Sequence, residues 1–383
     1  MKTSTSQRAA RNTRSRKNGD GGQMLEGMKI VDGTSLKVVT STNATQLFNP
    51  ASNTKLATTL AVVQKFGFDY RMQTRVLRNG TINAHGELEG DLFVSGCYML
   101  FGDRQAHELA QLLVRHGITS VSGDLYVSPL FCMNLHLDGE DAGKKLLSIL
   151  DPVHGRAPAV RHKTRLRRRK GSAAAVSSIS IAGTVKVAHP AEHAILIATH
   201  NAPPVKDVIK IMLCYSDNTM AEKFGVMVGG PSALEKFVID KVGVPAAEVH
   251  FETTSGLNSN RISPRAMMQI LVALRDTLAA AQLNLSDLLA VAGVDLGTMK
   301  GRLNSSGQAG SVIAKTGTLT ETDQGVSTLS GEISTTSGTY LFVIFEMHGD
   351  VLGFRHRQDQ LVSQFQVDHG GAQPIAYVPI LPR

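Results

Sequence analysis

Three short motifs combine the residue types that acyl transfer through a serine ester requires. They are Ser52-Asn53-Thr54-Lys55, Ser216-Asp217-Asn218 and Lys315-Thr316-Gly317, in this order along the 383-residue chain. The first offers a nucleophile and a base, the second a hydroxyl and an amide, and the third a cation within a strand. Each motif is common by chance, but the ordered set indicates a covalent serine active site.

Lys55 can reach the Ser52 hydroxyl because residues three positions apart lie on one face of a helix. The ordinary lysine pKa of about 10.4 keeps the amine charged at neutral pH. Burial or a neighbouring cation must therefore lower the pKa of Lys55, and Lys315 is the candidate cation. The Ser52 backbone N–H, in the first turn of the predicted helix, is a candidate oxyanion donor. Taken alone, Ser52 would be interpreted as a helix cap.

The second and third motifs predict how a substrate is held. We expect Ser216 to relay a proton to the leaving amine and Asn218 to bind a substrate amide. Gly317 lies inside a predicted strand, where a glycine often marks the close approach of another backbone. A substrate pairing along this strand would explain that glycine. The residues expected around its terminal carboxylate are Lys315, Thr316 and Thr318.

Hydrophobic periodicity predicts the elements that must position these residues. Residues 28–39 are typical of a hairpin, and a helix is expected from Ser52 to about Phe66. Short strands and one helix follow up to about residue 128, and residues 129–172 are predicted to be a loop. The remaining predictions are helices over 205–213, from about 219 and over 264–274, and an antiparallel meander of strands over 312–319, 325–333 and 339–347.

Charge is concentrated in two segments of the chain. The net charge of +8 comes from a basic N-terminal tail, expected to be disordered over residues 1–24, and a basic segment at 155–172. Outside them acidic residues outnumber basic ones, and no aromatic or zinc-finger motif indicates nucleic-acid binding. No apolar run is long enough to span a membrane, and residues 1–22 show no signal peptide.

Metal chemistry has one candidate motif, His189-Pro190-Ala191-Glu192-His193. Such a motif must lie on one helix to present both histidines to zinc. Pro190 is tolerated only in a first turn, and the segment after His193 is predicted to be a strand. We therefore expect no metal and no cofactor. The three cysteines form no paired framework.

The motifs resemble those of low-molecular-mass penicillin-binding proteins of the D-Ala-D-Ala carboxypeptidase/endopeptidase type, peptidase family S13. The likeness covers roughly residues 28–128 and 200–350. It implies an α/β (α+β) fold: a transpeptidase/β-lactamase-like domain with an antiparallel sheet flanked by helices, formed by residues 25–72 and 186–383, and a smaller α/β domain inserted at 73–185. Two accessory stretches agree with it, Ser255-Gly256-Leu257 with Asn260-Arg261-Ile262-Ser263-Pro264, and Val291-Ala292-Gly293-Val294-Asp295.

This resemblance implies that Ser52 attacks the penultimate D-Ala carbonyl of a peptidoglycan stem peptide and that Lys55 accepts its proton. The N–H groups of Ser52 and Thr318 would hold the oxyanion, and Ser216 would protonate the departing D-Ala. β-Lactam antibiotics would trap the same serine, and the family works in the periplasm or otherwise outside the cytoplasm. The chain departs from the family at an apparent insertion, Thr320–Gln324, at Leu296 and over residues 129–172.

Two alternatives stay open from the sequence. A serine β-lactamase shares the three motifs but places the second much closer to the first. A penicillin-binding-like fold that binds wall peptides without turnover is the non-enzyme alternative. The presence of Ser52, Lys55 and Lys315 favours an enzyme.

Overall fold

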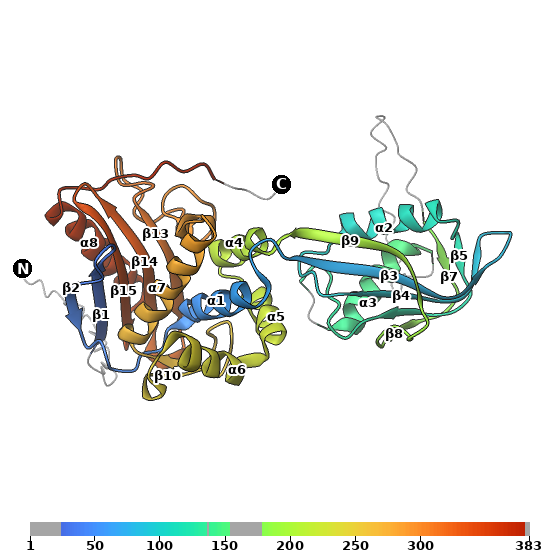
Figure 1. The fold of residues 1–383 in the computed structure, drawn as a ribbon, viewed down its shortest axis with the longest axis horizontal. Helices are drawn as coiled ribbons and strands as arrows, with labels where there is room; N and C mark the ends of the chain where they lie inside the picture. The colour runs from blue at the N-terminus through green and yellow to red at the C-terminus, as the bar shows by residue number, and fades with distance from the viewer. Residues whose placement is uncertain (1–23, 136–137, 154–177, 380–383) are drawn as a thin grey trace, which may run out of the picture.

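The computed structural model describes residues 24–135, 138–153 and 178–379. These residues form two lobes, each built on its own sheet (Figure 1). The two lobes are joined where β3 (Arg71–Ile82) and β9 (Ile195–Pro204) approach the helices α1 (Thr54–Phe66) and α4 (Val205–Tyr215) (Figure 1). The predicted tail at 1–24, apart from Met24, and the basic segment at 155–172 lie outside the described residues.

The first lobe contains a six-stranded antiparallel sheet in the order β12-β13-β14-β15-β1-β2. The predicted meander and the predicted N-terminal hairpin are both confirmed, because β13 pairs with β14, β14 with β15, and β1 with β2. The strands are β1 (Leu25–Asp32), β2 (Val38–Thr42), β12 (Ala290–Val291), β13 (Val312–Leu319), β14 (Val326–Thr335) and β15 (Gly338–Met347).

Helices cover this sheet and carry most of the motifs. The long helix α7 packs against β15 and β1, whereas α8 packs against β14. The helix α1 is buried along its first ten residues, so the Ser52–Lys55 motif is anchored in the core. A single 3₁₀ turn, Ala51–Asn53, precedes it. The helices are α1 (Thr54–Phe66), α4 (Val205–Tyr215), α5 (Asn218–Val228), α6 (Gly230–Phe237), α7 (Pro264–Ala280) and α8 (Val351–Asp368).

The second lobe contains a seven-stranded mixed sheet. Its main path is β7-β5-β4-β3-β9, and β6 pairs with β4 and β8. The helices α2 (Asp103–Arg115) and α3 (Gly139–Leu150) pack against one another beside it. The strands are β3 (Arg71–Ile82), β4 (Glu87–Gly96), β5 (Ser120–Val121), β6 (Leu125–Val127), β7 (Ser180–Ile181), β8 (Val185–Val187) and β9 (Ile195–Pro204).

Two details differ from the sequence analysis. The predicted loop over 129–172 contains α3, which begins where the Asp138 side chain accepts hydrogen bonds from two backbone N–H groups and which buries Leu146 and Leu150. Residues 195–204, assigned to the first domain, form β9 and pair with β3. We therefore propose residues 71–204 as the inserted unit.

Neither a metal site nor a membrane helix is found within the described ranges. The His189–His193 segment is extended and turn-like rather than helical. In these ranges, no group of three or more His, Cys, Asp or Glu side chains is arranged to hold a metal ion. Nor does any helix there have the length and apolarity needed to cross a membrane.

Candidate active site

Ser52 is presented by a strained turn at the start of α1. Ala51 has a φ of 45°, a left-handed conformation that is uncommon for a residue with a side chain. The Asn49 side chain holds this turn, because its Oδ1 accepts a hydrogen bond from the Ala51 N–H at 2.9 Å. The Asn49 amide nitrogen donates in turn to Asp323 Oδ2 at 2.8 Å. The segment Thr320–Gln324, which follows β13, therefore helps to hold the turn that carries the nucleophile.

Lys55 lies fully buried beneath Ser52. Its Nζ contacts Ser52 Oγ at 2.9 Å, Asn218 Oδ1 at 2.7 Å and the Ser255 carbonyl oxygen at 2.6 Å. Burial lowers the pKa of Lys55 to about 7, although Glu222 and Asp217 oppose this shift. An amine that is half deprotonated near neutral pH can accept the Ser52 proton.

Lys315 is also fully buried, beside Ser216. Its Nζ contacts Ser216 Oγ at 2.8 Å and the Thr316 carbonyl oxygen at 2.6 Å. Burial and the nearby Lys55 lower the pKa of Lys315 well below its usual value. Ser216 itself caps α4 in the left-handed conformation, with φ 57°, which directs the chain from α4 into α5. The three motifs therefore meet around two buried amines.

Gly317 allows β13 to lie directly against the Ser52 turn. A Cβ on Gly317 would stand 2.1 Å from Thr328 Oγ1 and 2.9 Å from the Ala51 Cβ. A larger residue would therefore push the strand away from the nucleophile. On its other edge, β13 pairs with β12 only at Ile313 and Ala314 in the described part of the chain. The edge beyond Ala314 can accept an extended peptide.

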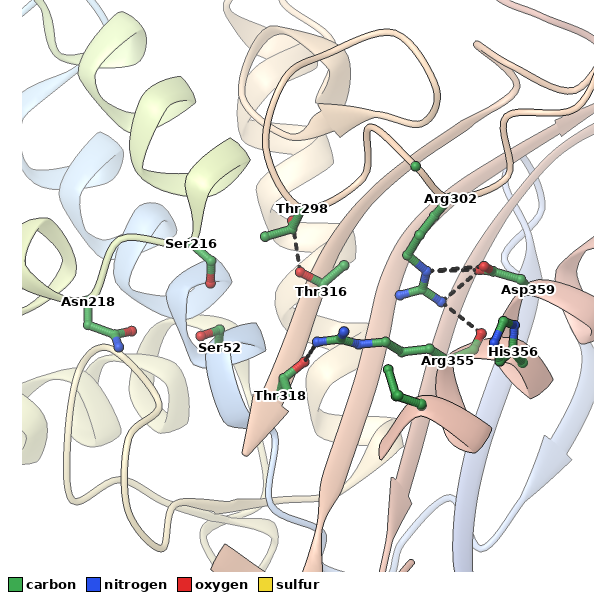
Figure 2. A pocket seen from close by; sticks show the side chains of 12 residues that line it. Ser52, Ser216, Asn218, Thr298, Arg302, Thr316, Thr318, Arg355, His356 and Asp359 are labelled. Carbon is green, nitrogen blue, oxygen red and sulfur yellow. Dashed lines mark hydrogen bonds and ion pairs between the residues drawn. The ribbon is translucent and has the colours of Figure 1, made fainter. Parts of the chain in front are cut away.

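A cavity of about 550 Å³ opens above Ser52 and extends to α8 (Figure 2). Ser52, Ser216 and Asn218 lie at one end, and Arg302, Arg355 and Asp359 at the other. Between them the Thr316 and Thr298 hydroxyls are 2.9 Å apart, and Arg355 donates to Thr318 Oγ1 at 2.8 Å. Lys55, Lys315 and Gly317 do not line the cavity. The full lining is Ser52, Ser216, Asn218, Thr298, Gly301, Arg302, Thr316, Thr318, Leu352, Arg355, His356 and Asp359.

All eight residues predicted from the motifs thus lie at or directly beneath one cavity. The sequence analysis missed the contribution of α8, because Arg355, His356 and Asp359 belong to no motif. It also missed Thr298 and Arg302. The only feature of the sequence that could have indicated a role for Thr298 is its position three residues after the Val291–Asp295 stretch.

Comparisons with known proteins agree with this geometry. The sequence profile of the D-Ala-D-Ala carboxypeptidase 3 (S13) family matches residues 17–132 and 170–365. Among curated protein sequences, none matches the chain significantly.

Solved structures with the same fold cover nearly the whole chain. A predatory peptidoglycan endopeptidase from Bdellovibrio bacteriovorus is 22% identical, with a TM-score of 0.72 over 93% of this chain and 96% of that one. A penicillin G-acylated form of a Bdellovibrio endopeptidase, bound to an immunity protein, is 22% identical with a TM-score of 0.71 over 94% of this chain and 97% of that one. Penicillin-binding protein 4 from Haemophilus influenzae is 21% identical, with a TM-score of 0.67 over 90% of this chain and 97% of that one.

These likenesses confirm the predicted fold class, and the profile match confirms the predicted family and type of enzyme, a peptidase of the D-Ala-D-Ala carboxypeptidase type. The chain belongs to the D-Ala-D-Ala carboxypeptidase 3 (S13) family.

Proposed function

We propose that this peptidase cleaves peptidoglycan stem peptides at the bond after the penultimate D-Ala, through an ester on Ser52. The observation that carries the proposal is the contact of 2.9 Å between Lys55 Nζ and Ser52 Oγ, made by an amine whose pKa burial lowers to about 7. Lys55 in its neutral form takes the Ser52 proton as Oγ attacks the D-Ala carbonyl. The family match and the arrangement of the three motifs support this assignment.

The tetrahedral intermediate would place its oxyanion between the backbone N–H groups of Ser52 and Thr318. Loss of one such donor typically costs about 10²–10³ in rate. When the C–N bond breaks, Ser216 passes a proton to the leaving amine. Lys315 orients that hydroxyl at 2.8 Å. The proton that Lys55 took from Ser52 then re-protonates Ser216, which returns Lys55 to its neutral form. Water then attacks the ester with Lys55 again as base, which releases the acid and frees Ser52.

The substrate would lie extended along the unpaired part of β13. Asn218 lines the cavity next to Ser52, where it can bind the amide of the acyl portion while it also contacts Lys55. The Thr316 and Thr318 hydroxyls lie on the leaving-group side. A cavity of about 550 Å³ is far larger than one alanine needs, which suits a cross-linked peptide as well as a free end.

A β-lactam should acylate Ser52 as an analogue of the same substrate. Because stem peptides lie outside the cytoplasmic membrane, we propose an extracytoplasmic location, which fractionation of the producing cells would test. The alternatives are a serine β-lactamase and a wall-peptide binder without turnover. No contact among the residues that the structure describes favours either of them.

The first experiment is labelling of the purified protein with a fluorescent penicillin, beside Ser52→Ala. We expect a stable adduct on the wild type alone, and release of D-Ala from a diacetyl-Lys-D-Ala-D-Ala peptide. Rapid loss of the label with β-lactam turnover would indicate a β-lactamase. Failure of the folded wild type both to label and to release D-Ala would contradict a catalytic role.

A further inference from the structure

Arg355 has an unusual position among the cations of the active site. It lies in the second turn of α8, half-buried, and donates one hydrogen bond to Thr318 Oγ1 at 2.8 Å. Within the described residues it forms no ion pair with a carboxylate. Its side chain points across the cavity toward the end of β13 (Figure 2). The guanidinium thus has several N–H donors left for a ligand.

The other positively charged side chains near the cavity already interact with groups of the protein. Arg302 makes a two-pronged ion pair with Asp359, with N–O distances of 2.7 and 3.0 Å, and also donates to Gln358 Oε1. Lys55 and Lys315 do not line the cavity, and burial lowers the pKa of both amines. Arg355 is therefore the cation that a ligand in this cavity would meet, as far as the described lining goes.

Arg302 also fixes the position of Arg355. Its guanidinium donates to the Arg355 carbonyl oxygen at 3.3 Å, so the first turns of α8 are tied to the loop that follows Thr298. Burial lowers the pKa of Arg355 from its usual value, and the charge of Arg302 acts in the same direction, whereas Asp359 opposes the shift. An arginine held next to another cation gains more than an exposed one from an anionic ligand.

We propose that Arg355, with the Thr318 hydroxyl, forms the subsite that binds the carboxylate beside the scissile amine. This proposal rests on the function proposed above and names the residue that makes the site select acidic leaving groups. That carboxylate is the free end of a D-Ala-D-Ala peptide, or the equivalent group on the acceptor residue of a cross-link. Arg355 takes the place that the sequence analysis gave to Lys315, whose amine faces Ser216 instead.

The geometry explains why a threonine pair alone would be insufficient. The Thr316 hydroxyl is shared with Thr298, and the Thr318 oxygen already accepts from Arg355. Thr316 donates its hydrogen to Thr298, whereas Thr318 can still donate its own, and both hydroxyls are neutral. A planar guanidinium beside them matches the two oxygens of a carboxylate and forms charge-assisted hydrogen bonds.

The test compares two enzymes with two substrates. One substrate is an acyl-D-Ala thioester whose leaving group is mercaptoacetate, which carries a carboxylate. The other has mercaptoacetamide, the neutral amide, as its leaving group. The two rates of Ser52 acylation therefore differ only through the carboxylate. We expect Arg355→Gln to lower kcat/KM for the acid by about 10- to 100-fold, the range for a hydrogen bond to a charged group, and to leave the amide nearly unchanged. Arg355→Lys should recover part of the loss, because it keeps the charge but not the fork.

Arg104→Gln is the matched control, because it removes one exposed positive charge from α2 in the other lobe. It should change neither rate. An equal loss on acid and amide in a folded Arg355→Gln variant would show that the side chain only supports Thr318. An unchanged acid rate would equally overturn the subsite.

A second measurement separates this proposal from the function itself. If the wild type cleaves no peptide or thioester and takes no penicillin, the proposed function fails, and the subsite is then tested by binding alone. Calorimetry on the Ser52→Ala variant compares N-acetyl-D-Ala-D-Ala with its C-terminal amide. Tighter binding of the acid that Arg355→Gln abolishes supports the subsite, whereas equal binding, or none at millimolar ligand, refutes it.

Discussion

Acylation of Ser52 should depend on pH through a single ionisation near pH 7. Lys55 must be neutral to accept the Ser52 proton, and burial lowers its pKa to about 7 from 10.5. Because the active form is the deprotonated one, the rate should rise as the pH rises and level off above the pKa. The opposite sign would apply to a group that acts as an acid in this step.

The size of the effect follows from the fraction of neutral Lys55. At pH 8 about nine-tenths of the molecules carry the neutral amine, at pH 7 about half and at pH 6 about one-tenth. The rate should therefore fall about fivefold from pH 7 to pH 6 and about tenfold per unit below that. An amine with the ordinary pKa of 10.5 would be almost entirely charged at pH 7, and the rate would keep rising beyond pH 9. The two cases differ most between pH 7.5 and 9.

The assay is the second-order rate of fluorescent-penicillin labelling from pH 5.5 to 9.5 at constant ionic strength. Asp217→Asn should move the midpoint to lower pH, because Asp217 raises the pKa of Lys55 and asparagine still caps α5. Lys55→Arg should lose at least about 10²-fold at every pH, because arginine stays protonated. A wild-type rate that is flat across pH 7, or that levels off only near pH 10, would refute the role of Lys55.

Three further outcomes follow from the packing and the charges. Ser52→Ala should show no added mass with penicillin in intact-protein mass spectrometry, with an unchanged melting temperature. Gly317→Ala should lower the free energy of unfolding by about 1–3 kcal/mol in urea titrations, because its Cβ would stand 2.1 Å from Thr328 Oγ1, whereas Gly301→Ala, with open space around it, should not. Glu346→Gln should raise the free energy of unfolding by about 1–2 kcal/mol at pH 8 but not below about pH 4.5. Burial raises the pKa of Glu346 to about 7, so ionisation of this side chain lowers the stability of the folded protein as the pH rises from about 4.5 to above 7. A gain for Glu346→Gln that persists at pH 4 would contradict that explanation.

The sequence predicted the parts of the site that local geometry determines. Ser52 and Lys55 are three residues apart at the start of a helix, and that spacing alone brings Nζ to within 2.9 Å of Oγ. The meander was predictable because runs of apolar residues with turn signals between them specify β13, β14 and β15 without distant contacts. The order of the three motifs then indicated the fold that joins them.

Tertiary packing determines the parts that the sequence did not predict. The helix α8 carries polar residues on several faces, and only its packing against β14 turns Arg355 toward Thr318. The same holds for β9, which the sequence analysis assigned to the second segment of the first domain. In the structure this strand pairs with β3, more than a hundred residues earlier. A boundary between domains depends on such pairings rather than on local composition.

The site divides its positive charges between two tasks that a motif search does not separate. Nucleophile activation needs an amine that gives up its proton near neutral pH, which burial of Lys55 provides. Anion recognition needs a cation that stays charged, which a buried lysine of lowered pKa cannot supply but an arginine can. A substrate carboxylate beside Lys315 would also raise the pKa of both amines and slow the attack by Ser52. Placing the recognition cation on α8 therefore keeps the binding of an acidic substrate from switching off the base.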